Sequence, residues 1–189
     1  ARGTVPTLMI HEGAAGHHFQ GSAQQLIGGV PLLRKVLPFG AYDEGWALYA
    51  ERVAKVDMGF YDADPLGDLG RLQAEMFRAV RLVVDTGMHA KRWSREQSIE
   101  YMVARTGMPE AEVTREIERY VVWPGQAASY KVGQLAMLRL REQAEKELGP
   151  KFDLRDFHEV ILMNGPMPLA VLEDVVQEWI KAQQAKPSA

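Results

Sequence analysis

The sequence has no cysteine among its 189 residues, which excludes disulfide bonds and thiolate metal ligands. It has no apolar run of the roughly 18–20 residues that a transmembrane helix needs, so we expect no membrane span. Acidic and basic residues nearly balance, at a formal net charge of −3. No tract of lysine and arginine is dense enough to predict a nucleic-acid partner. The hydrophobic share of 47% is that of an ordinary globular protein.

The chain also lacks the alternation of apolar and polar residues that is typical of β-strands. Apolar residues recur at spacings of three and four, which predicts an all-α protein of many helices. The expected helices cover residues 7–19, 43–56, 66–91, a segment beginning at Ser94, 109–122, 124–149, 153–165 and 168–184.

Several residues mark where these helices begin and end. Asp43 and Ser94 are N-cap candidates, and Gln97 lies three residues after Ser94, as in a capping box. Gly149 followed by proline ends the longest late segment. Along 66–91 one side of the helix carries an apolar stripe. The stripe consists of Leu69, Leu72, Met76, Val80 and Val83.

No repeat, low-complexity tract or linker divides the sequence, so we expect a single all-helical domain over 1–189, with a loose tail at 185–189. An apolar stretch at 5–10 follows Ala1 almost at once, which favours a fragment of a longer protein. Separation from the missing N-terminal half would expose apolar surface. We therefore expect association with that half, or a homo-oligomer. The compartment stays undetermined.

The most informative stretch is 9-MIHEGAAGHHFQG-21, which holds three of the five histidines. It resembles the zinc-peptidase pattern His-Glu-x-x-His, in which the second histidine follows the first by four residues. Here Ala15 occupies that place, and histidines follow at His17 and His18.

Helix geometry leaves the second ligand open. In a straight helix His17 lies about 120° away from His11, while His18 shares its face but lies about 10.5 Å further along the axis. Gly13 and Gly16 weaken the helix and permit a kink or bulge. A local insertion of about two residues would bring His17 to the usual ligand position. His18 is the alternative if the helix stays straight.

The residue types fit a catalytic zinc site, which has three protein ligands and a water. His11 fits the role of a ligand, and Glu12 fits that of the base that takes a proton from the water. Glu44, at the start of the next expected helix, is the best candidate for the third ligand. Glu51 lies seven residues further on the same face, where it would orient a histidine.

Other residues are assigned to ordinary structure. The pair His158–Glu159 has no histidine after it and is interpreted as helix surface. Tryptophans 46, 93, 123 and 179 are expected in the core rather than as substrate platforms.

Five segments, in order along the chain, together resemble the bacterial domain-of-unknown-function 885 family. They are 11-HEGAAGHHFQ-20, 44-EGWALYAE-51, 81-RLVVDTGMH-89 with Trp93, 124-PGQAASYKVGQ-134 and 164-NGPMPLAVLE-173. Members of that family are regarded as zinc metallopeptidases similar to the glutamate-type zincins. The resemblance implies a zincin-like helical architecture and corresponds to the C-terminal part of such proteins.

The resemblance also implies roles for individual residues. The step Gly16-His17 matches the second half of the peptidase motif, which favours His17 over His18. Tyr130 is similar in placement to a late tyrosine of related peptidases, whose phenol donates to the oxyanion of the tetrahedral intermediate. The family pattern has proline before the glycine, where this chain has Ala15, so the kink here depends on the glycines alone.

A polar cluster is expected on the long helix. Asp85 and His89 lie four residues apart, with Arg81 one turn earlier. In the functional interpretation His89 steadies a substrate carbonyl, Arg81 binds a substrate carboxylate, and Asp85 supports the cluster. A structural ion-pair network is the alternative.

These residues predict a zinc-dependent metallopeptidase, a hydrolase that cleaves short peptides, with Zn²⁺ as cofactor. The altered histidine spacing supports one alternative, a helical protein that binds metal or peptide without turnover. A ferritin-like dinuclear site is excluded, because that class needs Glu-x-x-His segments and this chain has none.

Overall fold

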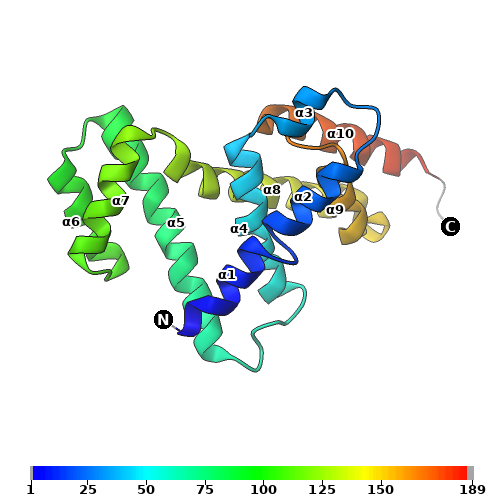
Figure 1. Cartoon of the computed structure of the whole chain (residues 1–189). Helices are drawn as coiled ribbons and strands as arrows, with labels where there is room; N and C mark the ends of the chain where they lie inside the picture. The colour runs from blue at the N-terminus through cyan, green and yellow to red at the C-terminus, as the bar shows by residue number, and fades with distance from the viewer. Residues whose placement is uncertain (1, 187–189) are drawn as a thin grey trace.

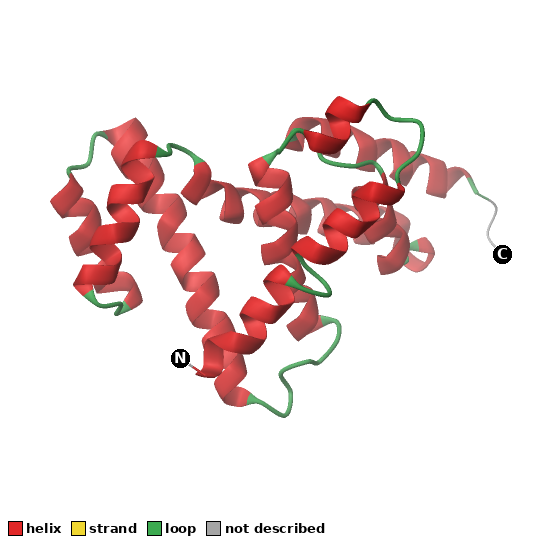
Figure 2. Cartoon of the chain, in the orientation of Figure 1, coloured by secondary structure: helices red, strands yellow, loops and turns green. Residues whose placement is uncertain are grey.

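The computed structural model describes residues 2–186, and the expected all-α class is confirmed, with no strand in that range (Figure 1 and Figure 2). The elements in chain order are η1 (Arg2–Thr4), α1 (Val5–Glu12), α2 (His17–Leu26), α3 (Leu32–Val36), α4 (Gly40–Val56), α5 (Pro65–Lys91), α6 (Arg95–Thr106), α7 (Glu110–Val122), α8 (Gln126–Leu148), η2 (Gly149–Lys151), α9 (Leu154–Met163) and α10 (Leu169–Ala185).

Most expected helices are present, and the corrections concern the N-terminal third. The single helix expected at 7–19 is two helices, because the chain leaves helical geometry after Glu12 and resumes it at His17. Helix α3 was not expected. Helix α4 begins at Gly40, and Asp43 supports its first turn by accepting the Phe39 N–H, rather than serving as N-cap. The capping box of Ser94 and Gln97 is confirmed. Residues 187–189 of the expected tail lie outside the described range.

Two hydrophobic clusters share helix α8. One joins α4 and the C-terminal half of α8 to α9 and α10, around Tyr49, Met137 and Phe157. The other joins α5, α6 and α7 to Ala127 near the start of α8. Figure 1 shows α8 running from the side of α6 and α7 toward that of α9 and α10. Residues at the first turns of α8 therefore lie at the junction of the two clusters.

Helices α4 and α8 cross with their backbones in contact. A Cβ atom added at Gly45 would lie 2.5 Å from the Cα of Gly133, and one added at Gly133 would lie 1.8 Å from the carbonyl oxygen of Ala41. No side chain fits between the helices at this point. The glycine pair therefore sets how closely the two helices approach, and with them the side chains they carry on this face.

Two assignments of side chains to core or surface were wrong, those of Trp123 and His158, and the apolar stripe of α5 is largely uncovered. On α5 only Val80 of the apolar stripe is buried, while Leu69, Leu72 and Met76 are about half exposed, at 54%, 50% and 51%. Trp123 is 59% exposed rather than in the core. His158 is half-buried, and its Nε2 lies 2.9 Å from the Tyr49 hydroxyl.

Burial lowers the pKa of His158 to about 4. The imidazole is therefore neutral near pH 7 and packs against the rings of Trp46 and Tyr49.

Among the helices of residues 2–186, none combines the length and the apolar character that a membrane span requires.

We expect Gly133→Ala to lower the free energy of unfolding by about 1–3 kcal/mol, as overpacking of a close contact does. Chemical denaturation followed by circular dichroism measures the change. Gly21→Ala is the matched control: it lies within α2 and its added Cβ has no neighbour within 4 Å. If the Gly133 variant were as stable as the Gly21 variant, the crossing would not depend on the glycine pair.

Candidate metal centre

The turn between α1 and α2 resolves the unusual histidine spacing. A Cβ atom at Gly16 would lie 1.7 Å from the His11 carbonyl oxygen, so only glycine allows this approach. The Trp46 indole donates to the Ala15 carbonyl oxygen at 3.0 Å and ties the turn to α4. The chain thus folds back on the end of α1 without a proline, and α2 starts with His17 beside His11.

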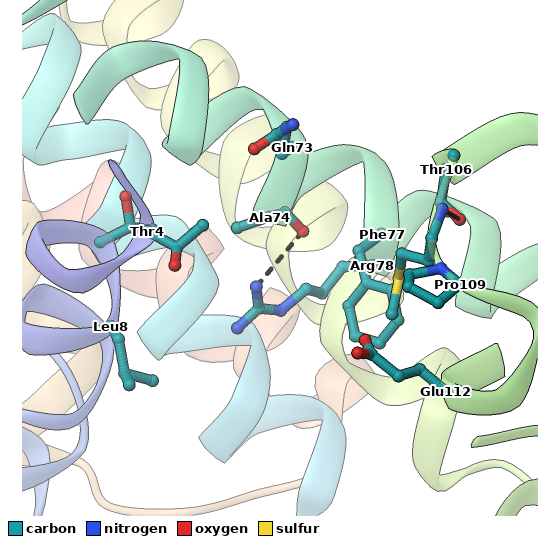
Figure 3. Close-up of a pocket in the computed structure, with 12 residues that line it drawn as sticks. Thr4, Leu8, Gln73, Ala74, Phe77, Arg78, Thr106, Pro109 and Glu112 are labelled. Carbon is teal, nitrogen blue, oxygen red and sulfur yellow. Dashed lines mark hydrogen bonds between the residues drawn. The ribbon is translucent and has the colours of Figure 1, made fainter. Parts of the chain in front are cut away.

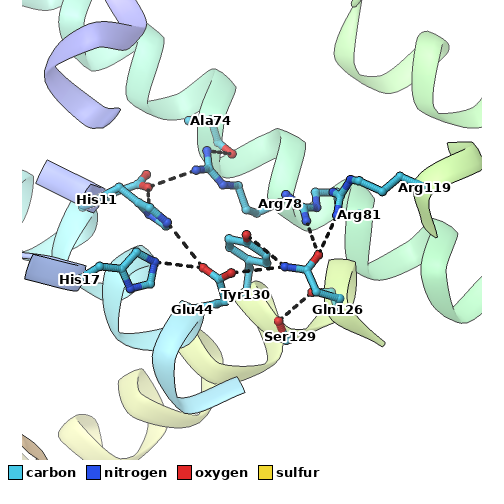
Figure 4. Close-up of polar contacts among 11 residues, drawn as sticks. His11, His17, Glu44, Ala74, Arg78, Arg81, Arg119, Gln126, Ser129 and Tyr130 are labelled. Atoms are coloured by element: carbon cyan, nitrogen blue, oxygen red, sulfur yellow. Dashed lines mark hydrogen bonds and ion pairs between the residues drawn. The ribbon is translucent and has the colours of Figure 1, made fainter. Parts of the chain in front are cut away.

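Three side chains converge at this turn (Figure 4). The Nε2 of His17 lies 3.1 Å from Oε2 of Glu44, and the Nε2 of His11 lies 3.7 Å from the same oxygen. One ligand atom from each of the three residues falls within 4.8 Å of the other two. The two imidazole rings meet edge to face, at 4.9 Å between centroids. These residues are the candidate metal ligands, and α1, α2 and α4 each contribute one.

Glu51 fixes the orientation of the His11 ring. Its Oε1 lies 2.8 Å from Nδ1 of His11, and both side chains are almost fully buried. A carboxylate at Nδ1 favours the tautomer with the proton there, which would leave the Nε2 lone pair available to a cation. Arg78 lies 3.6 Å from the same carboxylate oxygen and balances its charge. The expected contact of Glu51 with a histidine is present.

The structure separates the two adjacent histidines. His17 is half-buried and belongs to the convergent set, whereas His18 is exposed and lies outside it. Glu12, the last residue of α1, is exposed beside His11 and is also outside the set. The geometry therefore favours His17 as the second ligand and leaves Glu12 accessible from solvent.

The three candidate ligands alter one another's protonation. Burial alone would raise the pKa of Glu44, but hydrogen bonds with His11, His17 and Tyr130 outweigh it and hold that pKa well below its usual range. The hydrogen bond to Glu44 raises the pKa of His17 against the opposing effect of burial. Burial lowers the pKa of His11, but Glu44 and Glu51 together raise it by more. A cation at this set would compete with protons, so its affinity falls as the pH falls.

Gln126 connects the set to the arginines and was not identified from the sequence. Its Oε1 accepts from Arg81 at 3.1 Å and from Arg119 at 3.0 Å. Since guanidinium groups only donate, the amide nitrogen must face the other way. It donates to Oε1 of Glu44 and to the Tyr130 hydroxyl, both at 3.3 Å. Glu44 therefore keeps one oxygen on Gln126 and the other toward the histidines.

Tyr130 lies beside the set, as expected. Its ring stacks on that of His11 with 6.0 Å between centroids. Burial raises the pKa of Tyr130, and the nearby Glu44 carboxylate raises it further, so the phenol is protonated at neutral pH. Because its oxygen accepts from Gln126, the phenolic proton is directed elsewhere, toward Glu44 or a molecule bound at the set.

Arg81 is buried rather than open to a substrate. Its guanidinium lies 4.2 Å from the centre of the Tyr130 ring and also packs on Phe77 and Tyr120. In the described part of the chain no carboxylate lies within ion-pair distance of it. The side chain contacts Tyr130 and Gln126, and its expected contact with a substrate carboxylate stays a prediction.

Asp85 and His89 also contact the backbone at the end of α7 and the start of α8, rather than the candidate metal ligands. The Asp85 carboxylate accepts the backbone N–H groups of Gly125 and Ala128, at 3.1 and 2.9 Å, and so caps the start of α8. His89 places Nε2 3.0 Å from the Tyr120 carbonyl oxygen and 3.5 Å from Asp85. The polar cluster is thus structural, and the expected contact of His89 with a substrate carbonyl has no support in this geometry.

Two cavities flank the site. One, of about 460 Å³, lies between α1, α5 and the α6–α7 turn, with Arg78, Phe77 and Leu8 in its walls (Figure 3). There Arg78 donates to the Ala74 carbonyl oxygen at 3.3 Å. The other, of about 680 Å³, includes His17 and Glu44 in its wall together with the exposed Trp123. Trp123 was assigned to the core from the sequence, so its place in the wall of this cavity was not predicted.

The profile of a family described as bacterial proteins of unknown function, DUF885, matches residues 1–176. The chain belongs to the DUF885 family. The family resemblance is therefore confirmed, and the descriptor says nothing of activity. No curated protein matches the chain.

Two solved structures are similar to this DUF885 chain. A protein from Colwellia psychrerythraea, titled a putative lipoprotein, is 55% identical with a TM-score of 0.92 over 96% of this chain. A putative lipoprotein of unknown function from Shewanella oneidensis is 27% identical with a TM-score of 0.82 over 90% of it. The DUF885 chain spans 31% of the length of each.

The adjacent histidines give a direct test of the ligand set. We expect His17→Ala to abolish tight binding of one Zn²⁺ per chain, and His18→Ala to leave it within about threefold, because only His17 reaches Glu44. Competition with a chromogenic chelator measures both affinities. Equal losses in the two variants would mean that the turn does not select between the histidines.

Glu51→Gln tests the orientation of His11. We expect zinc affinity to fall about 10–100-fold, the usual effect of removing a carboxylate behind a ligand histidine. Glu159→Gln, an exposed glutamate on α9, is the control and should bind as the unaltered chain does. An unchanged affinity in a folded Glu51→Gln sample would contradict this role.

Proposed function

We propose that this chain carries the catalytic zinc site of a metallopeptidase that hydrolyses short peptides. The observation that carries the proposal is the convergence of His11, His17 and Glu44, with a carboxylate behind His11 and a protonated phenol beside the set. Two imidazoles and one carboxylate are a ligand set of catalytic zinc sites.

The spacing of the three groups suits the size of the ion. Zinc bonds to nitrogen and oxygen are about 2.0–2.2 Å, so ligand atoms of a tetrahedral site lie roughly 3.4 Å apart. The contacts of Glu44 with His17 and His11, at 3.1 and 3.7 Å, bracket that value. Because Gln126 holds the other oxygen of Glu44, a single oxygen is left to bind the ion.

A bound zinc ion would polarise the scissile carbonyl and make a water molecule acidic near neutral pH. In the proposed reaction the Glu12 carboxylate would accept a proton from the attacking water molecule as the water oxygen bonds to the carbonyl carbon. Glu12 then gives the proton to the amide nitrogen as the carbon–nitrogen bond breaks, so the products are one carboxylate and one amine. Its exposed position at the end of α1, next to His11, is compatible with this role.

Tyr130 supplies the second catalytic group in this proposal. Its protonated hydroxyl can donate to the oxyanion that forms on the attacked carbonyl. Gln126 supports this, since by donating to the phenol oxygen it leaves the phenolic proton available. Arg81 under the ring keeps the phenol in place.

A protein that binds metal or peptide without turnover is the second candidate. It is favoured by the length of the chain, which spans 31% of the length of each solved relative, because other parts of such proteins could contribute to a substrate cleft. Metal binding supports both candidates, and only hydrolysis separates them.

We expect Glu12→Gln to bind zinc as the unaltered chain does and to lose about 10²–10⁴-fold in kcat, because it removes the proton acceptor and no ligand. Tyr130→Phe should lower kcat by about 10²–10³-fold at an unchanged zinc content. Hydrolysis of a quenched fluorescent peptide library by zinc-loaded protein, with elemental analysis of each sample, measures both. Full activity of the Glu12 variant would rule out this mechanism.

A further inference from the structure

The cavity of about 680 Å³ opens directly beside the candidate metal centre. His17 and Glu44 form part of its wall, and the rest comes from the start of α4, the segment before α8 and the first turns of α8. Its volume is within the usual range for small-ligand pockets. A molecule held at the set by its reacting group would therefore extend into this space.

The lining of the cavity is mainly apolar. Pro38, Ala41, Trp123 and Val132 contribute to it, and none of the lysine or arginine side chains that the structure describes does. Its acids are already engaged: Asp43 accepts the Phe39 N–H at 3.0 Å, and Glu44 contacts the histidines and Gln126. Among the described side chains, the space thus has no cation for an acidic group and no free carboxylate for a basic one.

Trp123 is held outside the hydrophobic clusters by a defined corner of the chain. The backbone N–H of Trp123 donates to the Tyr120 carbonyl oxygen at 3.2 Å, and the Trp123 carbonyl oxygen accepts from the backbone N–H of Gln126 at 3.4 Å. Packing within the fold does not account for its position, since the side chain is 59% exposed. An indole in the wall of a cavity is a large apolar contact surface.

We propose that this cavity is a specificity pocket for an apolar or aromatic side chain of the peptide, on a residue flanking the scissile bond. The proposal rests on the proposed peptidase function and adds the class of substrate. Acidic side chains are disfavoured, because the described carboxylates in the cavity wall are those of Asp43 and Glu44. The indole of Trp123 and the side chain of Val132 supply the contacts that discriminate.

Amino-acid hydroxamates test the pocket without requiring turnover, because the hydroxamate binds zinc and the side chain explores the cavity. The zinc-loaded chain is titrated calorimetrically with acetohydroxamate and with the hydroxamates of glycine, leucine, phenylalanine, lysine and glutamate. We expect the leucine and phenylalanine compounds to bind about tenfold more tightly than the glycine compound. The lysine and glutamate compounds should gain nothing.

Two variants and one control locate the effect. Trp123→Ala and Val132→Glu should each reduce the advantage of phenylalanine over glycine to less than about threefold. Val122→Ala should keep it, since Val122 is 80% exposed next to Trp123 and does not line the cavity. Circular dichroism checks that each variant is folded.

The possible outcomes separate the pocket from the peptidase function. If glycine and phenylalanine hydroxamates bound equally, or lysine bound best, the specificity pocket would be refuted while the metal site stood. If the advantage of phenylalanine survived both variants, the pocket would lie elsewhere and the assignment to Trp123 would be wrong. If no hydroxamate bound and no peptide were hydrolysed, both the proposed function and the specificity pocket would be refuted.

Discussion

The contact between Gly45 and Gly133 is the constraint on which the rest of the site depends. With no side chain between them, α4 and α8 approach to backbone contact. Glu44 immediately precedes one glycine, and Tyr130 lies one turn before the other, so both side chains emerge beside the crossing. Their proximity, and that of Gln126 a further turn back, follows from how closely two helices can pack when both have only hydrogen at the contact.

The second constraint is local and acts on the histidines. The two additional residues between them, compared with the zinc-peptidase pattern, do not form a bulge within one helix. They belong to a turn that ends one helix and begins another, and the turn requires Gly16 because its backbone touches that of His11. The Trp46 indole holds this turn against α4, which ties it to the glycine crossing.

The sequence predicted features that short-range patterns determine. The long helices, the Ser94 capping box and the grouping of His11 with Glu44 and Glu51 follow from periodicity and residue type. The break after Glu12 was only partly foreseen, because glycine permits many conformations and the His11 carbonyl that selects one comes from packing. Gln126 was missed because its role arises from arginines on α5 and α7, which no local pattern connects to it. The α5 stripe shows the converse limit: periodicity identifies an apolar face but not whether anything covers it.

The helices that carry the side chains of the site determine which substitutions related sequences can accept. The candidate ligands come from α1, α2 and α4. The side chains that position the Tyr130 phenol and the Glu44 carboxylate come from α5, α7 and α8. The wall containing Trp123 lies on the connection between α7 and α8. Related sequences can therefore alter that connection, and with it the shape of the neighbouring space, through substitutions that leave the helices bearing the ligands unchanged. In the proposed function, the preference for a substrate side chain would therefore vary between related sequences independently of zinc binding.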